Sequence, residues 1–535
     1  MTDPASLAAH PLARRAVPVF LLAVMAALLV SSSLHKRLVY DEYDNLSYGY
    51  RFLTKGPGVA PEGQRMPVLV LSALACAAQG CDLEDVNDRE GVRLGVRAAS
   101  MVFAIGLALV LWRWAGHLLG PVGGLAALWL AVFDPTVLGH GKQVTSDVAV
   151  TAFMLAAVCA YWRHRQRPGP WPIVACAAAT AGAILSKFTG LLLVPILGAL
   201  VTIDLARAWR SGGRPTRRNV GRAAGIGVAM ALFVLFLINA AYLFHGSFRP
   251  ASDYRWRSQA FQQHFTSPLP IPLPRVFTQG LDYSSFLQEN PERARGYNYV
   301  LGRLSREGVW YAFPLMVLLK TPLAVFVLAA LGLRARVAPG VATATHPDGG
   351  RGMGALVAIP FAVVMLFFSL AVDAQLGIRY VLPALPFLTL AAARGATDLA
   401  GHRRWLVPLL LVWHAGSTLS YHPHFIPYFN ELIGRRVNAY RYLADSNLDW
   451  EDHAWWIAAF RRTHPDVVLD PATPWPGWIL VGANDLVGIL DPERYRWLRE
   501  GFSPVTHVAY AHLLFYVPPE RLGAAPSPTP SPPPP

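Results

Sequence analysis

The chain is poor in charge and especially in lysine. Charged residues make up 15% of its 535 residues, whereas 53% are hydrophobic. This composition is too apolar for a soluble enzyme of this size and predicts a polytopic membrane protein. Only five of the 47 basic residues are lysines. The net charge of +14 does not indicate nucleic-acid binding, because the arginines fall in separate loops between apolar segments rather than on one basic face.

Several motifs of other protein classes are missing as well. The sequence contains no P-loop and no Rossmann fingerprint, so no nucleotide site is predicted. No internal repeat indicates the duplicated halves of a transporter. The four cysteines lack metal-ligand spacing. Cys159 and Cys176 lie in apolar segments, whereas Cys76 and Cys81 lie in a predicted outer loop, where their spacing allows either a disulfide or two free thiols.

Long apolar runs are the dominant pattern that is present. A run of about 17 to 25 apolar residues is long enough to cross the hydrocarbon of a bilayer. The first run follows two arginines, but no cleavage site precedes His35, so we expect a retained anchor rather than a secretory signal. The runs predict an α-helical membrane protein with about eleven spans. They begin near Val17, Leu94, Val122, Val148, Ile173, Gly190, Ala223, Tyr311, Gly354, Val381 and Trp405.

The arginine distribution predicts the orientation in the membrane. With the amino terminus in the cytoplasm, the short basic loops fall on that side, as the positive-inside rule requires. An odd number of spans then places the carboxyl terminus outside. The Arg-rich and Pro-rich composition is typical of a bacterium, so we expect the inner membrane. The cytoplasmic arginines would be Arg14, Arg15, Arg163, Arg165, Arg167, those in the run 207–222, Arg334, Arg336, Arg351, Arg394, Arg403 and Arg404.

Hydropathy divides the chain into three parts. The predicted membrane domain spans 1–420, with long outer loops at 35–92 and 244–310. Residues 421–523 predict a small outer α+β domain, and 524–535 have the Pro/Ser bias of an unfolded tail. Strand-like runs of the outer domain lie at 478–481 and 505–517.

Two adjacent carboxylates directly follow the first span. The stretch LVYDEYDN places Asp41 and Glu42 at the predicted outer surface of the membrane. An acid close to hydrocarbon costs a few kcal/mol unless it finds a partner. The pair therefore suggests chemistry at the bilayer face, and a solvated loop start is the alternative.

A short outer loop brings further polar residues to the same side. The sequence FDPTVLGHGKQVTSDVAV presents His140, Lys142 and Asp147. His140 and Asp147, together with Glu42, are candidates for ligating a divalent cation, and the loop residues are candidates for contacting a sugar or an acceptor. The alternative is that Asp147 or a hydroxyl beside it only caps the following helix.

Two lysines stand out by their position. Lys187 lies in LSKFTG, in a brief outer turn, where its ammonium group suits a phosphate, and snorkelling is the alternative. Lys320 lies inside a predicted span, in VLLKTPLAVF, where Pro322 breaks the helical hydrogen-bond ladder. A cation inside the membrane is a functional hypothesis by default.

Another cation lies in the turn AVDAQLGIRYVLPALPF. Arg379 and Tyr380 are predicted at the outer surface, where Arg379 either clamps a phosphate or pairs with Asp373.

The stretch DSNLDWED, residues 445–452, fails as a calcium loop, because Trp450 stands where Gly is needed. We expect a helix start there, with acidic residues near its positive end.

Together these motifs resemble the membrane glycosyltransferases that use polyprenyl-phosphate sugars, the GT-C superfamily with the protein O-mannosyltransferases and the lipid A aminoarabinose transferases. The resemblance covers most of the chain. It implies that Asp41 is the catalytic acid residue with Glu42 beside it, that Arg97 corresponds to an arginine of the mannosyltransferases, and that Lys187 contacts the carrier phosphate. The motifs are DEYDN, GHGKQVTSD, LSKFTG, YNYVLGRLSREGVWYAFPLMVLLKTP, LGIRYVLPALPF, and YHPHFIPYFNELIG followed by DSNLDW.

The resemblance and the residues predict one reaction. Asp41 would act as general base on an acceptor hydroxyl, and cations would stabilise the departing phosphate, with inversion at the sugar. No cofactor is required, although a divalent cation could assist. The expected partners are a polyprenyl-phosphate sugar donor and the bilayer, and the acceptor is a protein, a lipid or a glycan. The alternatives are a transporter or lipid flippase, and a non-catalytic scaffold. The cations are Arg97, Lys187, Lys320 and Arg379, with Tyr380 beside the last.

Overall fold

The computed structural model describes residues 11–58, 66–81, 83, 86–210, 217–294, 296–334 and 353–522. The predicted Pro-rich tail 524–535 lies outside the described residues, as do Arg336, Arg351 and part of the run 207–222, and the side chains of Arg14 and Arg15 are likewise not described.

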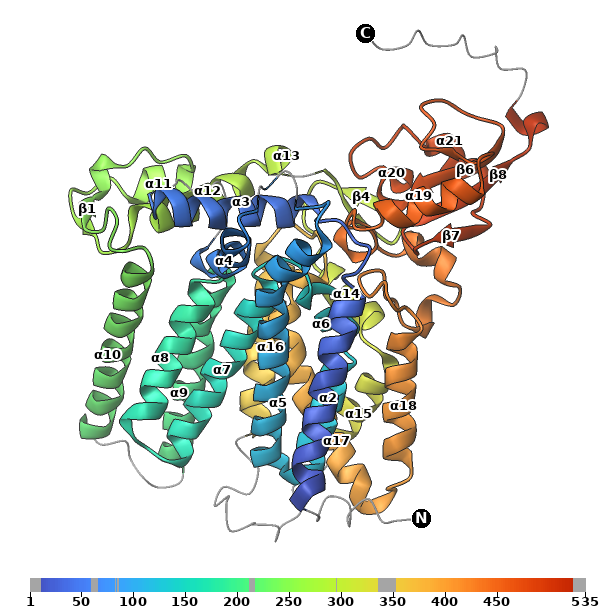
Figure 1. Ribbon diagram of the computed structural model, residues 1–535. Coiled ribbons are helices and arrows are strands. Elements are labelled where there is room, and N and C mark those ends of the chain that lie inside the picture. The colour runs from blue at the N-terminus through green and yellow to red at the C-terminus, as the bar shows by residue number, and fades with distance from the viewer. Residues whose placement is uncertain are drawn as a thin grey trace.

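Most of the chain forms a bundle of apolar helices that run side by side (Figure 1). In the described part, four helices are long and apolar enough to cross a membrane, and one bent pair also passes this test. The chain is therefore a polytopic membrane protein, and the number of about eleven spans stays a prediction. The bundle helices are α2 (Pro11–Ser31), α5 (Glu90–Val132), α7 (Asp147–Gln166), α8 (Pro170–Ile184), α9 (Leu193–Arg210), α10 (Arg217–Ala241), α14 (Ala312–Lys320), α15 (Leu323–Arg334), α16 (Met353–Ala371), α17 (Leu385–His402) and α18 (Leu406–Leu419).

Two breaks in the helices have identifiable causes. The long α5 is kinked at Gly120, whose φ of 81° a residue with a side chain rarely adopts, and Pro121 follows directly. Helices α14 and α15 meet at an angle of 106°. Pro322 lies in that break, as the sequence predicted, and it has no N–H to continue the ladder.

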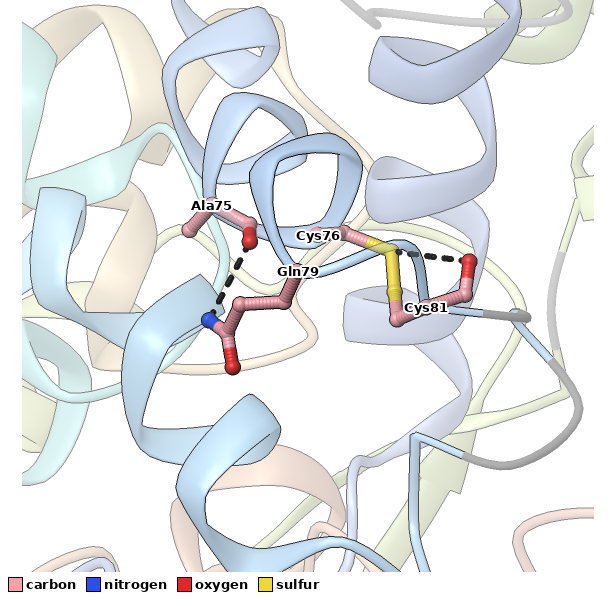
Figure 2. The surroundings of a disulfide bond; sticks show 4 residues. All are labelled: Ala75, Cys76, Gln79 and Cys81. Carbon is pink, nitrogen blue, oxygen red and sulfur yellow. Dashed lines mark hydrogen bonds between the residues drawn. A yellow bond between two sulfur atoms is a disulfide. The ribbon is translucent and has the colours of Figure 1, made fainter.

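Shorter elements gather at one end of the bundle, the upper end in Figure 1. Helix α3 (Tyr40–Lys55) runs across this end and packs on α4 (Val70–Ala78). Cys76 and Cys81 form a disulfide at the end of α4, which resolves the open alternative for this pair. Figure 2 shows the bond, with Gln79 Nε2 donating to the Ala75 carbonyl at 3.1 Å beside it. The other elements here are α6 (Pro135–Gly141), β1 (Arg249–Pro250), α11 (Gln259–His264), β2 (Pro270–Ile271), α12 (Arg275–Glu289), α13 (Pro291–Ala294), β3 (Asn298–Val300), β4 (Arg303–Ser305), and the 3-10 helices η1 (Pro67–Leu69), η2 (Phe188–Leu192), η3 (Ala251–Asp253), η4 (Ile378–Tyr380) and η5 (Leu382–Ala384).

The carboxyl-terminal part lies at the same end and contains a four-stranded sheet in the order β5-β6-β8-β7 (Figure 1). Both predicted strand-like runs are in this sheet, where β6 pairs antiparallel with β8 from Gly477 opposite Val517 to Gly482 opposite His512. Strand β5 is parallel to β6, and β7 is antiparallel to β8. The elements are η6 (Glu431–Ile433), η7 (Arg436–Arg441), η8 (Asp445–Asn447), α19 (Ala454–Thr463), β5 (Val468–Leu469), β6 (Gly477–Gly482), α20 (Ala483–Val487), α21 (Arg496–Gly501), β7 (Thr506–Val508), β8 (His512–Val517) and η9 (Pro519–Leu522).

Candidate active site

Asp41 lies in the first turn of α3 and forms an ion pair with a residue far along the chain. Arg379 Nη1 donates to Asp41 Oδ2 at 2.7 Å, and the Asp41 side chain is 38% exposed. Asp41 is thus a carboxylate partner of Arg379, and Asp373, the partner considered from the sequence, accepts at Oδ1 from the Gly308 backbone N–H. The solvated loop start proposed for Asp41 is also corrected, since the carboxylate belongs to a helix and has a cationic partner.

Arg379 is fixed by aromatic rings as well as by Asp41. Its guanidinium carbon lies 4.3 Å from the ring centre of Trp450 and 5.8 Å from that of Tyr380. Burial opposes the charged form, but the carboxylates of Asp41 and Asp147 outweigh it and raise the pKa of Arg379 above its ordinary value. The guanidinium is therefore a permanent cation with a defined orientation.

A second ion pair lies against the same tyrosine. Lys187 Nζ donates to Asp147 Oδ1 at 2.7 Å and lies 4.7 Å from the ring centre of Tyr380. Tyr380 thus contacts the cations of both pairs. The idea that Asp147 or its neighbours only cap a helix is wrong, because Ser146 is the N-cap of α7 and no side chain caps it.

His140 lies beside these pairs in α6. It is buried and its ring packs against Trp450, with the centroids 5.4 Å apart. Burial lowers the pKa of His140 to about 3, although the nearby Asp147 carboxylate opposes this effect. The imidazole is therefore neutral at physiological pH, and its Nδ1 has no hydrogen-bond partner among the described residues.

Glu42, the sequence neighbour of Asp41, lies in a very different place. Its side chain is fully buried, and Arg97 binds it with two hydrogen bonds of 2.9 and 2.7 Å. The backbone N–H groups of Val39 and Val144 also donate to this carboxylate. Glu42 and Arg97, predicted respectively at the catalytic centre and at the carrier phosphate, are thus each other's partners.

Lys142 and Lys320 are also buried and already bonded. Lys142 Nζ donates to Asp452 Oδ2 at 3.0 Å, and burial lowers the pKa of Lys142 to about 7. Lys320 Nζ donates to the carbonyls of Ile426 and Asn447, and it lies 4.7 Å from the ring centre of Phe429.

No group of three or more His, Cys, Asp and Glu side chains is arranged to hold a metal ion within the described ranges. The predicted ligands Glu42, His140 and Asp147 therefore do not form such a set. The oxygens of Glu42 are occupied by Arg97 and by backbone donors, and Asp147 is occupied by Lys187.

The structure thus brings six predicted residues together and separates four others from them. Asp41, Asp147, Lys187, Arg379 and Tyr380 form two linked ion pairs with His140 beside them, whereas Glu42, Arg97, Lys142 and Lys320 lie in buried contacts. Sequence reasoning missed Trp450 and Asp452. Helix α19 begins at Ala454, so the predicted helix start is displaced and Asp452 pairs with lysines rather than with a helix end.

The comparisons with known proteins confirm the predicted resemblance. Residues 90–238 match the family of dolichyl-phosphate-mannose-protein mannosyltransferases. The apo crystal structure of ArnT from Cupriavidus metallidurans has a similar fold, with a TM-score of 0.50 at 12% sequence identity, covering 93% of this chain and 97% of that chain.

Two other solved structures are more distant. ArnT from the same organism bound to undecaprenyl phosphate gives a TM-score of 0.47 at 12% identity, with 93% and 97% of the chains covered. The apo oligosaccharyltransferase of Archaeoglobus fulgidus gives 0.47 at 12% identity, with 75% of this chain and 54% of that chain covered. No curated protein sequence is significantly similar to the chain.

Proposed function

We propose that the chain transfers a sugar from a polyprenyl-phosphate donor to an acceptor hydroxyl, with inversion, at the outer face of a bacterial inner membrane. The observation that carries this proposal is the pair of carboxylate–cation contacts that share Tyr380: Asp41 with Arg379, and Asp147 with Lys187. A base and phosphate-binding cations are the groups that this reaction needs.

In this reaction the carboxylate of Asp41 and the two cations, Arg379 and Lys187, have different roles. The acceptor oxygen forms a bond to the anomeric carbon while the bond between that carbon and the phosphate oxygen breaks. The acceptor proton goes to Asp41, and the leaving phosphate gains negative charge that Arg379 and Lys187 stabilise. A second carboxylate at nucleophile distance would be needed for retention. The proposal assigns Asp147 to holding Lys187 rather than to nucleophilic attack, and with Asp41 as the single base inversion is expected.

The ion pairs also suggest how the donor enters. Both cations are neutralised by carboxylates in the structure. An incoming phosphate offers Arg379 a bidentate partner, and exchange of Asp41 for phosphate would free Asp41 Oδ2 to accept the proton. Asp41 is 38% exposed, so water can solvate this carboxylate when phosphate takes its place on Arg379, whose side chain is 13% exposed.

The four buried residues take structural roles in this proposal. Arg97 holds Glu42, and Lys320 is satisfied by backbone carbonyls. A cation inside the membrane would also be ordinary in a transporter or flippase, but the ammonium group of Lys320 is bonded to backbone carbonyls. In this proposal Arg379 and Lys187 supply the positive charge for the phosphate, and no step is assigned to a divalent cation.

The test is an assay in membranes with radiolabelled polyprenyl-phosphate sugars. A panel of donors is supplied to wild type and to Asp41→Asn, and release of the free carrier is measured. Release by wild type that Asp41→Asn abolishes would identify the donor and support the assignment of the base. If no donor turns over while both proteins bind the carrier equally, the catalytic assignment is abandoned and movement of lipid is tested instead.

A further inference from the structure

Asp452 is a buried acid that the proposed reaction does not use. Its side chain is fully buried, and one oxygen, Oδ2, accepts from two lysines, Lys36 at 2.8 Å and Lys142 at 3.0 Å. Burial opposes ionisation, but His453, Lys36 and Lys142 outweigh it and hold the pKa of Asp452 well below its ordinary value. The group is therefore a carboxylate bridging two ammonium groups, which are far from it in sequence.

Lys36 belongs to the short linker 32–39 between α2 and α3, which leads directly to Asp41. The linker is bonded from several sides. Arg97 donates to the carbonyls of Ser33 and Lys36, each at 3.3 Å, and to that of Arg37 at 2.9 Å. Lys142 donates to the Ser32 carbonyl at 3.2 Å. The side chain of Lys36 connects this linker to Asp452 in the carboxyl-terminal part of the chain, where His35 also lies beside Trp455 and Val39 packs with Trp450.

The segment around Asp452 contacts one partner of the proposed catalytic pair, Arg379, and the linker that leads to the other, Asp41. Trp450, two residues before it, lies against Arg379. Trp455, three residues after it, lies against Arg93, whose guanidinium carbon is 4.5 Å from the ring centre. The segment 450–455 thus packs on the Arg379 side through an aromatic ring and on the Asp41 side through a carboxylate.

We propose that Asp452 is a positioning residue for Asp41: its carboxylate binds Lys36 and thereby fixes the linker 32–39, so that Asp41 meets Arg379 and the acceptor. This inference rests on the proposed function in which Asp41 is the base. It predicts that loss of Asp452 moves the linker and lowers turnover without weakening the binding of the carrier phosphate, because Arg379 and Lys187 stay in place.

The first test needs no substrate. Hydrogen exchange by mass spectrometry compares wild type with Asp452→Asn and with the control Asp466→Asn, an exposed acid in the same part of the chain. Asp452→Asn is expected to raise exchange in peptides covering 32–43 by at least about tenfold and to leave β6 and β8 unchanged. Unchanged protection of 32–43 would overturn the proposal.

A double variant keeps the test valid if Asp452→Asn folds poorly. Lys36→Met/Asp452→Asn removes one cation and one anion, so the formal charge of the cluster is unchanged. Only Lys142 then lacks its carboxylate partner, whereas Asp452→Asn alone leaves both Lys36 and Lys142 without it. If Asp452 positions Asp41 through Lys36, the double variant regains thermal stability but its kcat remains low, with an unchanged KM for the donor. If Asp452 is only structural, kcat returns together with stability, and the proposal fails.

Binding of the carrier by the Asp452 variants is measured with undecaprenyl phosphate alone. The activity and the carrier binding of Asp41→Asn are measured alongside them. Full activity of Asp41→Asn would refute the proposed function. An inactive Asp41→Asn beside a fully active Asp452→Asn would refute only the positioning role of Asp452. Loss of carrier binding in Asp452→Asn would also refute that role, because the phosphate-binding cations should be unaffected.

Discussion

Asp41 and Glu42 are adjacent in the sequence and occupy opposite environments. Asp41 is 38% exposed and has one cationic partner, whereas Glu42 is fully buried with Arg97 and backbone donors around it. The same contrast separates Lys187, at 12% side-chain exposure, from Lys142, which is fully buried. The molecule therefore contains a partly exposed set of ion pairs and a buried set, at the same end of the bundle.

The two sets should respond differently to substitution. An ion pair open to water contributes about 0–1 kcal/mol, so its members can exchange partners with a substrate at small cost. A buried pair is expensive to break, since the remaining charge is left without a partner in a medium of low polarity. The clearest difference in exposure is that between Asp41, at 38%, and Glu42, at 0%, whereas Asp147 is itself buried and owes its place in the first set to Lys187.

The largest expected effect on stability is that of Glu42→Gln. The substitution leaves Arg97 buried without a carboxylate, and we expect the free energy of unfolding to fall by about 3–5 kcal/mol. The measurement is the thermal unfolding of the purified protein in detergent, with Asp41→Asn as the matched control of the adjacent acid. Equal unfolding temperatures for the two variants would contradict the contrast between the buried and exposed sets.

A smaller effect is expected for Lys187→Met. Loss of one charged donor to the carrier phosphate should weaken the binding of undecaprenyl phosphate about 10- to 100-fold, as the loss of a hydrogen bond of about 1.5–3 kcal/mol implies. Lys55→Met, which changes an exposed lysine at the end of α3, should leave the affinity unchanged. An equal loss in both variants would indicate general charge attraction rather than a phosphate site.

The smallest predicted effect concerns pH and the buried Asp449. Burial raises the pKa of Asp449 from 3.8 to about 7, so the folded state binds a proton more tightly than the unfolded chain. Stability from this group is present below pH 4 and is lost as the pH rises toward 7. The Asn side chain of Asp449→Asn does not ionise, so the variant does not lose this stability as the pH rises. It should therefore unfold about 1–3 °C higher than wild type at pH 8 and at the same temperature as wild type at pH 4. A gain of the same size at both values would exclude titration of Asp449 as the cause.

Much of the partly exposed set was predictable, because each member follows an apolar run at the same predicted membrane face. That rule found Asp41, Asp147, Lys187 and Arg379, which the structure brings together. The rule could not pair them, since Asp41 meets Arg379 across 338 positions of sequence. It therefore offered Asp373, and not Asp41, as the carboxylate partner of Arg379.

The buried set was not predictable in the same way. Adjacent residues of a helix point about 100° apart, so either Asp41 or Glu42 could face the bundle, and the choice depends on Arg97 in a distant helix. Asp452 lies in a segment whose composition resembled an ordinary helix start. Its partners Lys36 and Lys142 come from other segments, and only the folded chain shows that one carboxylate binds both.

The most direct test of the account is the single-turnover release of carrier from a donor bound to purified Asp41→Asn, with wild type alongside and the affinity for undecaprenyl phosphate measured on the same samples. The account predicts that release slows by about 10²- to 10⁴-fold, as expected for loss of a general base, while the carrier binds at least as tightly because Arg379 has lost its internal partner. Release at the wild-type rate from a folded Asp41→Asn protein would contradict it.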